Sequence, residues 1–458
     1  MYYNKRYNFL GGVCVDKGST LMSEGCIWKK ITFFALPLFL GNLFQQLYNT
    51  ADSLIVGNFL GSNALAAVSS SGNLIFLMVG FFNGIAMGAG VVIARYFGAK
   101  DVENMQKAIH TTVAFGLVAS VVLTIVGVLL APQMLIWMDT PSNVLPSSIT
   151  YFRIYFAGSL GLVMYNIFVG ILQAIGDSKH PLYYLIISSI TNIVLDIVFI
   201  SIFHFGVGAA AFATILSQFL SAFLCLVLLM RSRESYRLEL KKIAFHKKHL
   251  GMILRLGIPS GIQNSIIAIA NVVVQSNINA FGEMAMAGCG AYSKIEGFAF
   301  LPITSFTMAL TTFVGQNSGA KEYERTKKGA FFGMMCSMLL AEGIGILIFL
   351  FAPALTKAFN NDPQVIQFGV ERARTSALFF FLLAYSHCVS AILRGVGKSS
   401  IPMFVMLVCW CVIRVSILMF FTPIFHSIQV VYWVYPITWT LSSIVFFLYY
   451  KKANWLYA

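Results

Sequence analysis

The sequence predicts an all-α polytopic membrane protein with twelve transmembrane helices in two six-helix lobes. Three observations predict this fold. The chain of 458 residues is 58% apolar and only 10% charged, whereas a soluble domain carries about 25% charged residues. The apolar residues fall in blocks of about 20 residues or more, the length that crosses hydrocarbon as a helix. Short motifs also recur at one constant offset, which indicates two halves.

Each apolar block is expected to be helical, because lipid offers no hydrogen-bond partners to an exposed backbone. The segment ahead of the first span lacks the layout of a cleavable signal peptide, and Met22 offers an alternative start. The predicted spans cover residues 31–55, 65–93, 108–131, 150–175, 182–203, 206–230, 253–280, 288–316, 329–352, 368–395, 400–422 and 428–450.

The distribution of positive charge predicts the orientation. Of the 31 Lys and Arg residues, 25 fall before the first span, in alternate loops or at the span ends beside them, and after the last span. The opposite loops and the span ends beside them hold only Lys357, Arg372 and Arg374. Because positive residues concentrate in cytoplasmic loops, we expect a multi-pass protein of the plasma (inner) membrane with both termini in the cytoplasm. The net charge of +14 is then a membrane signature and not a sign of nucleic-acid binding.

An internal repeat divides the chain. Ile171-Leu-Gln-Ala-Ile-Gly-Asp-Ser-Lys-His-Pro181 matches Ile392-Leu-Arg-Gly-Val-Gly-Lys-Ser-Ser-Ile-Pro402 at an offset of 221, and Gly98-Ala-Lys100 matches Gly319-Ala-Lys321 at the same offset. Pro37 pairs with Pro259 at 222. Glycine is favoured at helix C-termini, so Gly98 and Gly319 are predicted to end helices.

Six spans per half give parallel repeats related by a pseudo-twofold axis along the membrane normal, which is a known transporter plan. The predicted parts are a cytoplasmic segment (1–30), an N-lobe (31–230), a basic linker (231–252), a C-lobe (253–450) and a cytoplasmic tail (451–458). Two such lobes can rock about a central cleft. We expect a monomer.

Polar residues within the N-lobe spans predict a cation site. An ionisable residue within a span is costly and usually faces protein or a water-filled cavity. Asp52 ends a polar stripe on span one that includes Asn42, Gln45 and Asn49. Asn192 and Asp196 lie four apart on one face of span five. A carboxyl group there is expected to take up a proton or to pair with a cation such as Na⁺, an ion that prefers oxygen ligands.

Other readings of the first half remain open at this level. Asp52 lies near the outer end of its span, where it could contact bulk water. Asn166 in span four and Thr214 in span six could serve the same site or could simply link helices by hydrogen bonds. Pro37 removes a backbone hydrogen bond, so it is either a hinge that couples the charge of Asp52 to cavity shape or a static kink.

The second half predicts a polar cavity without an obvious ion site. A polar face on span seven, Glu296 on span eight and His387 on span ten are the candidate groups. His387 stands at the place of Asn166 under the offset of 221 and is either packed or a proton carrier. The predicted substrate-contacting residues are Gln45, Asn49, Gln263, Asn271, Gln275, Glu296 and His387.

With these motifs identified, the chain resembles the multidrug and toxic compound extrusion family over residues 30–450. Pro37 and Pro181 belong to the resemblance. The remaining motifs are Asn49-Thr-Ala-Asp-Ser-Leu-Ile-Val-Gly57, Leu172-Gln-Ala-Ile-Gly-Asp177, Asn192-Ile-Val-Leu-Asp196, Lys294-Ile-Glu-Gly-Phe-Ala-Phe300, Thr311-Thr-Phe-Val-Gly-Gln-Asn-Ser-Gly-Ala320 and Leu393-Arg-Gly-Val-Gly397.

The resemblance implies an antiporter that exports cationic and amphipathic drugs in exchange for H⁺ or Na⁺, with no further cofactor and no enzymatic activity. It also implies a cation site formed by Asp52, Asn192, Asp196 and Thr214, with Asn166 in the same lobe. Another branch of the family uses acids in spans seven and ten, where this chain has Gln263 and His387. Coupling through the N-lobe is therefore expected.

Two rival classes of protein would require different residues. A flippase for a lipid-linked precursor could use a similar two-lobe body, but it should carry cationic side chains in the cleft to hold phosphates, or extra spans. Among the cations assigned to the spans, only Arg153, Lys294 and Arg414 qualify. A membrane-embedded enzyme should show a paired-His metal motif, a G-x-S-x-G motif or a phosphate loop, and the sequence contains none of them.

Overall fold

Helices form almost all of the chain that the computed structural model describes, which is residues 20–138 and 140–456. No strand occurs within those residues. The first half contains α1 (Ile27–Leu60), α2 (Ser62–Gly98), α3 (Val102–Trp137), α4 (Leu145–Ala157), α5 (Ser159–Ala174), α6 (Lys179–Asp196), the π-helical segment η1 (Ile197–Ile202) and α7 (Gly208–Arg231). The predicted N-terminal segment lies outside the described residues as far as residue 19.

The second half repeats this order after the short 3₁₀ turn η2 (Leu240–Lys242). It contains α8 (Lys247–Asn279), α9 (Glu283–Gly319), α10 (Tyr323–Lys357), α11 (Pro363–Ser376), the 3₁₀ turn η3 (Ala377–Phe379), α12 (Phe380–Gly395), α13 (Ser400–Met406), the π-helical segment η4 (Leu407–Ile413), α14 (Arg414–Phe425) and α15 (Gln429–Lys452).

The helices account for the predicted spans. Among the described residues, 11 helices are long and apolar enough to cross a membrane. The pair α4 and α5 adds one more, because the two meet at Gly158 with a bend of 51° and form a broken span. The total of up to 12 confirms the predicted number. Large apolar side chains such as Leu129, Leu339 and Phe420 remain exposed, as expected of a surface that contacts lipid.

The backbone repeats the offset seen in the sequence. Lys100 and Lys321, which match in the repeat, are both left-handed, with φ of 57° and 60°. Positive φ values also recur in matching pairs at Gly61 and Gly282, Gly176 and Gly397, and His204 and His426. A positive φ is uncommon for a residue with a side chain, so the recurrence of the lysine and histidine pairs confirms that the halves are two copies of one fold.

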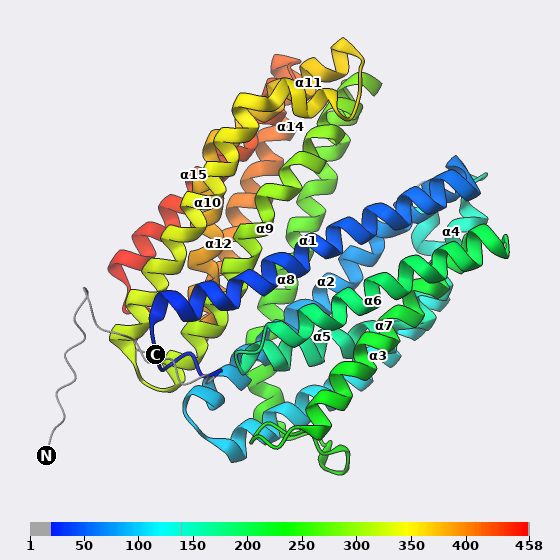
Figure 1. The fold of residues 1–458 in the computed structure, drawn as a ribbon. Helices are drawn as coiled ribbons and strands as arrows, with labels where there is room; N and C mark the ends of the chain where they lie inside the picture. Colours follow the sequence, from blue (N-terminus) through cyan, green and yellow to red (C-terminus); the bar gives the residue numbers. More distant parts are fainter. Residues whose placement is uncertain (1–19, 139, 457–458) are drawn as a thin grey trace, which may run out of the picture.

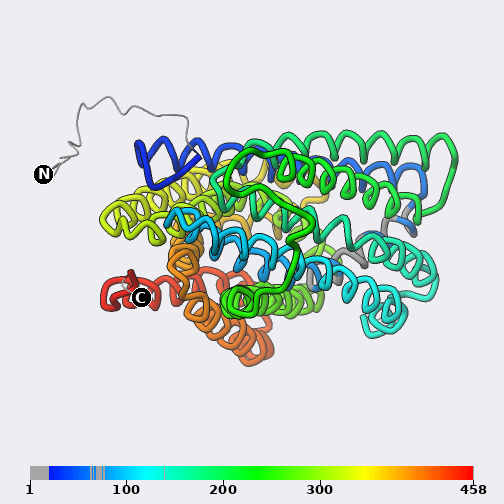
Figure 2. Tube along the Cα trace, turned by 90° about the horizontal axis from the view of Figure 1, so that it is seen from below, coloured from blue at the N-terminus to red at the C-terminus, as the bar shows by residue number. Residues whose placement is uncertain are grey.

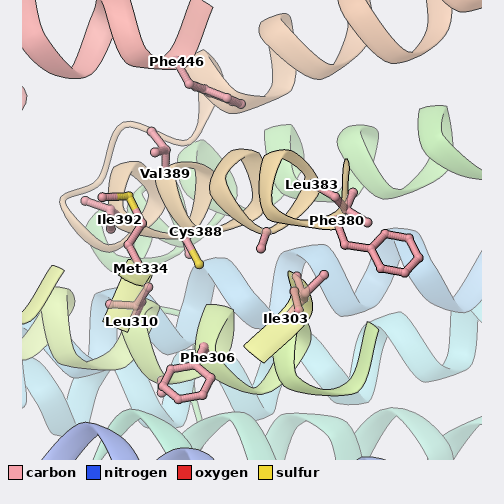
Figure 3. Close-up of a cluster of buried hydrophobic side chains, with 14 of the residues drawn as sticks. Ile303, Phe306, Leu310, Met334, Phe380, Leu383, Cys388, Val389, Ile392 and Phe446 are labelled. Carbon is pink, nitrogen blue, oxygen red and sulfur yellow. The ribbon is translucent and has the colours of Figure 1, made fainter. Parts of the chain in front are cut away.

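Helices α1–α7 form the N-lobe and α8–α15 form the C-lobe, each around its own apolar core. Figure 3 shows part of the C-lobe core, where Phe380 and Val389 of α12 pack among side chains of α9, α10 and α15. The linker between the lobes is anchored on α3. There the Gln106 side chain donates to the carbonyl oxygens of Ser235 and Arg237.

The lobes meet along α2 and α8, which cross at glycines. A Cβ atom on Gly84 would lie 2.2 Å from the backbone nitrogen of Gly261, and one on Gly88 would lie 2.4 Å from that of Gly257. Each helix therefore presents two glycines four residues apart, a pattern that lets membrane helices approach closely.

A second close approach joins the lobes at the end of the molecule that carries Lys100, Lys321 and the linker, here named the basic end. A Cβ atom on Gly98 would lie 1.9 Å from the carbonyl oxygen of Gln316, and one on Gly319 would lie 2.0 Å from that of Arg95. Gly98 and Gly319 do end α2 and α9, as predicted. Their physical role differs from the predicted one, because the left-handed residue is the lysine two positions later and each glycine instead makes room for the other lobe.

The chain ahead of α1 crosses this closed end. The Met22 backbone N–H donates to Oε1 of Gln316 at 2.7 Å, and Nη2 of Arg325 donates to the Met22 carbonyl at 2.9 Å. An ion pair of 3.1 Å joins Glu24 to Lys100 of the N-lobe. The bundles thus converge near the basic end and separate toward α4 and α11 (Figure 1).

Candidate functional site

The two predicted acids meet inside the N-lobe. The carboxyl groups of Asp52 on α1 and Asp196 on α6 lie close enough to interact electrostatically with each other. Asp196 is fully buried and Asn192, one turn earlier, is 2% exposed. Both oxygens of Asp196, Oδ1 of Asp52 and both polar atoms of the Asn192 amide are buried without a hydrogen-bond partner among the other described residues.

Local helix geometry presents these groups. Asn192 and Asp196 share a face of α6 because they are four residues apart. Asp196 is the last α-helical residue, and the π-helical η1 begins at Ile197. Such wide turns are rare and are often found at functional sites. The alternative that Asp52 only contacts bulk water is not what the structure shows, since its carboxyl group faces a buried acid.

Two acids in contact define the chemistry of this site. Like charges a few ångströms apart in a medium of low dielectric cannot both stay ionised without a bound cation. A pair of this kind is able to take up a proton or a metal cation. The orphaned oxygens of Asp52, Asp196 and Asn192 are the hard donors that Na⁺ accepts, so the residues present fit either ion.

Two tyrosines near the acids were not predicted. Tyr48 of α1 and Tyr151 of α4 both interact electrostatically with Asp52, and Tyr151 also does so with Asp196. Tyr48 lies one turn before Asp52 on the same face of α1, so the helical period could have identified it. Nothing in the local sequence brings Tyr151 to the site.

The other two residues of the predicted cation site are bonded elsewhere. The Thr214 hydroxyl donates to the carbonyl oxygen of Ala210 at 3.0 Å, and the Asn166 amide donates to that of Leu162 at 2.8 Å. No hydrogen bond or ion pair of the described residues joins either one to Asp52 or Asp196. Thr214 is half-buried and keeps its acceptor lone pairs.

The predicted polar stripe of α1 divides along its length. Asn42 donates to the hydroxyl groups of Thr304 at 3.2 Å and Ser305 at 3.4 Å, across the boundary between the lobes. Gln45 and Asn49 are exposed. The stripe therefore runs from an inter-lobe contact to the acid pair.

Two predicted C-lobe residues lie in the interior. Nε2 of Gln263 donates to the Ser390 hydroxyl at 3.5 Å. The ring of His387 packs edge-on against Trp410, with centroids 5.4 Å apart, and against Phe300 at 6.0 Å. His387 is therefore packed among aromatic rings, and its Nε2 is buried without a hydrogen-bond partner among the described residues. Its role as a proton carrier stays a prediction. Asn271 and Gln275 are exposed on α8.

Glu296 belongs to a charged cluster that the sequence did not indicate. It interacts electrostatically with Arg372 of α11 and Arg414 of α14, which are 4% and 1% exposed. Arg414 donates to the Thr438 hydroxyl at 2.9 Å, and its guanidinium lies 4.6 Å from the ring centroid of Tyr435. The sequence placed Arg372 in a loop and found no partner for Arg414.

A cavity of about 260 Å³ separates the lobes. None of the residues predicted to contact substrate lines it, whereas Asn166 does. It lies toward the basic end, because Thr311 is close to the end of α9 and Arg394 to that of α12. The lining residues are Asn83, Ala86, Met87, Gly90, Val91, Asn166, Val169, Gly170, Gln173, Ala174, Thr307, Met308, Thr311, Thr312 and Arg394.

Helix α1 connects the two lobes around Pro37. Before the proline, Ile31, Phe34 and Ala35 belong to the apolar core of the C-lobe. After it, Val56 packs in an N-lobe cluster. Figure 2 shows the blue start of α1 beside the yellow-green segment of α10. Pro37 thus lies where α1 passes from one lobe to the other.

Known proteins are similar to this chain in sequence and in structure. The chain is 28% identical over 440 residues to the "Probable multidrug resistance protein YoeA" of Bacillus subtilis, with 94% of each chain covered. It is also 28% identical over 383 residues to the "Probable multidrug resistance protein NorM" of Thermotoga maritima, with 83% and 82% covered. A structure described as the outward-facing conformation of a multidrug resistance MATE family transporter matches with a TM-score of 0.87 and 26% identity, over 95% of this chain and 97% of that one.

The family model supplies the assignment. The MatE model matches residues 37–198 and matches again at residues 259–420. The second match is offset from the first by the same interval that separates Pro37 from Pro259, in agreement with the repeat in sequence and backbone. The model thus covers most of both lobes, and the chain belongs to the MatE family of membrane transporters.

Proposed function

We propose that this protein exports cationic or amphipathic drug-like compounds in exchange for H⁺ or Na⁺ bound by Asp52 and Asp196. One observation carries this proposal: two carboxyl groups on different helices face each other in the N-lobe with their oxygens otherwise unpartnered among the described residues. Two interacting carboxyl groups take up and release protons as a coupled pair. The names of the relatives, which describe multidrug resistance proteins, support the substrate class.

The proposed orientation places the basic end in the cytoplasm, because positive residues concentrate there. The lobes are in contact at that end and separate at the other (Figure 1). This state corresponds to one open to the outside. A cation from outside would reach the acid pair first. Rocking of the lobes would then open the basic end, release the cation and admit substrate.

Within this cycle the chain's own residues have distinct tasks. Asp52, Asp196 and Asn192 would supply the oxygens that hold the ion. Tyr48 and Tyr151 would screen the pair from water and report its charge to α1 and α4, since both rings lie within electrostatic reach. A bound Na⁺ would supply the positive charge that lets both carboxyl groups remain ionised, and a proton would achieve the same by neutralising one of them.

A transport assay in proteoliposomes tests the proposal. Vesicles containing the purified protein are loaded with a fluorescent organic cation, and H⁺ and Na⁺ gradients are imposed separately. We expect export to follow one of the two gradients and to stop when a matching ionophore dissipates it. Protein-free vesicles provide the leak control. The proposal is wrong if sealed vesicles move no dye under either gradient.

Replacing Pro37 by Ala should slow export by about fivefold or more, because a restored backbone hydrogen bond stiffens the helix at the place where it passes between the lobes. The melting temperature should stay the same or rise. Initial rates of dye export and thermal unfolding measure the two effects. Pro132→Ala is the matched control, since Pro132 also lies inside a long helix, but one that belongs to the N-lobe alone. Equal rates for wild type and Pro37→Ala would exclude the hinge.

A further inference from the structure

The cavity between the lobes contains a charge that the proposed cation exchange does not use. Arg394 lines it from α12. Its side chain is 6% exposed, and its Nε is buried without a hydrogen-bond partner among the described residues. Its place at the end of a hydrophobic block predicts a position beside a cytoplasmic loop, and in the structure it belongs to the last turn of α12.

No acid in the described part of the chain balances this guanidinium. None of the ion pairs found there includes Arg394, and the titratable side chain within reach of its charge is His387. Buried arginines are nearly always paired, because an isolated charge in a medium of low dielectric is unfavourable. A cavity that exposes such a cation to its contents is therefore suited to an anionic guest.

The remaining lining fits one end of an amphipathic molecule. The amides of Asn83 and Gln173, which line the cavity, take no part in the side-chain hydrogen bonds of the described residues. Their N–H groups can therefore donate to an oxyanion. Met87, Met308 and Val169 supply an apolar wall. A volume of about 260 Å³ is near the lower limit for a small-molecule pocket.

The internal repeat shows that the charge is particular to one lobe. Arg394 corresponds to Gln173 at the offset of 221, and both residues line the same cavity. The two lobes thus present equivalent positions to one space, with a neutral amide on the N-lobe wall and a guanidinium on the C-lobe wall. The same helix arrangement occurs in both lobes, and in the N-lobe it forms without a positive charge at this position. The fold therefore does not require the charge of Arg394.

We infer that this cavity binds amphipathic molecules through an oxyanion group, a carboxylate or a phosphate, held by Arg394 with the amides of Asn83 and Gln173. Substrates then include zwitterions and organic anions, and not only cations. The inference rests on the proposed export function, to which it adds a substrate class. The oxyanion can belong to a small amphipathic compound or to a lipid headgroup, and the chemistry of recognition is the same for both.

A matched pair of dyes tests the inference by binding alone. Fluorescence anisotropy of a rhodamine carboxylic acid and of its methyl ester is measured with the purified full-length protein in detergent. We expect wild type to bind the acid more tightly than the ester. Arg394→Gln should weaken binding of the acid about tenfold, because a charge-assisted hydrogen bond is lost, and should leave the ester within a factor of about two. Arg394→Lys should keep part of the preference.

A variant that moves the positive charge to the other lobe distinguishes a loss of binding from a loss of folding. Adding Gln173→Arg to Arg394→Gln moves the cation to the opposite wall of the same cavity, and we expect the preference for the acid to return. Equal loss of acid and ester in Arg394→Gln would overturn the inference, and so would wild type without a preference. The binding measurement needs no gradient. If the wild-type protein discriminates between the dyes but exports neither, the proposed export function is wrong and the proposed binding site still stands.

A lipid assay identifies the source of the oxyanion. Proteoliposomes with a headgroup-labelled anionic phospholipid are treated with a quencher that cannot cross the membrane. Arg394-dependent movement of this lipid would assign the site to headgroups. Movement in neither wild type nor variant, together with binding of the rhodamine acid, would assign it to small amphipathic compounds.

Discussion

Asp52→Asn and Asp196→Asn are each expected to abolish gradient-driven export, with rates reduced about a hundredfold or more, because the exchange requires two carboxyl groups to share one cation. Either variant leaves one acid beside an amide of the same shape. That acid can stay neutral permanently and no longer needs to take up or release an ion. Binding of the dye should change little, because the acid pair lies in the N-lobe apart from the residues that line the inter-lobe cavity.

A double variant of both aspartates tests whether the two acids act as one unit. Residues that act as one unit show non-additive losses, so Asp52→Asn with Asp196→Asn should be no slower than either single variant. Glu103→Gln is the matched control, since it makes the same chemical change at an exposed residue paired with Lys107. Initial export rates under separate H⁺ and Na⁺ gradients are the measurement. Normal pumping by both single variants under every gradient would place the coupling ion elsewhere.

The sequence predicted one side of this site better than the other. Asn192 and Asp196 were assigned to one face because four residues make about one helical turn, and that relation is local. The meeting of Asp52 with Asp196 depends on how α1 packs against α6, which no local pattern encodes. There the family resemblance supplied the pairing. Tyr151 could not be predicted from the sequence. It interacts with both acids from α4, and the residues next to it in the sequence do not indicate this.

Hydropathy also assigned the wrong surroundings to two arginines near helix ends, because burial between lobes is not a local property either. Arg394 and Arg372 each follow or begin an apolar block, so hydropathy assigns them to water. The structure buries both, one against the inter-lobe cavity and the other beside Glu296. Hydropathy averages over a window and therefore cannot distinguish a cation that points to solvent from one that points between two lobes.

Glycine roles were likewise recognised only in part. The sequence predicted helix ends at Gly98 and Gly319, and both helices do end there. Their matching positions reflect the repeat, but the reason for having no side chain is a contact with the other lobe. Close approach of two helices is a tertiary property, and it is read from the structure.

Gly98→Ala and Gly319→Ala are therefore expected to open the basic end. A Cβ atom at either position would lie about 2 Å from a backbone oxygen of the opposite lobe, and backbone cannot move aside as a flexible side chain can. Overpacking of this kind costs about 1–3 kcal/mol. The cost falls only on states in which the lobes touch at this end. The variants should therefore shift the population toward the opposite state by about tenfold and slow export in proportion.

Spin labels on Lys107 and Lys328, which lie on different lobes near the basic end, report the distance between the lobes by pulsed electron paramagnetic resonance. We expect longer distances in both glycine variants than in wild type. Gly343→Ala is the control, because a Cβ atom there would meet nothing within 4 Å and alanine favours a helix over glycine. It should leave the distance distribution and the rate unchanged.

The glycine variants are expected to behave differently from the aspartate variants. Export by Gly98→Ala should depend on the same ion gradient as export by the wild type, because the acid pair is intact. The export rate should fall only because the state in which the lobes touch at the basic end is less populated. The double variant Gly98→Ala with Gly319→Ala should be worse than either single variant, since each glycine faces a separate oxygen, of Gln316 and of Arg95. Wild-type distances and rates in all three variants would mean that the lobes do not need this contact to alternate. Rocking about the α2–α8 crossing would then have to be limited elsewhere along that interface, at Gly84 or Gly88.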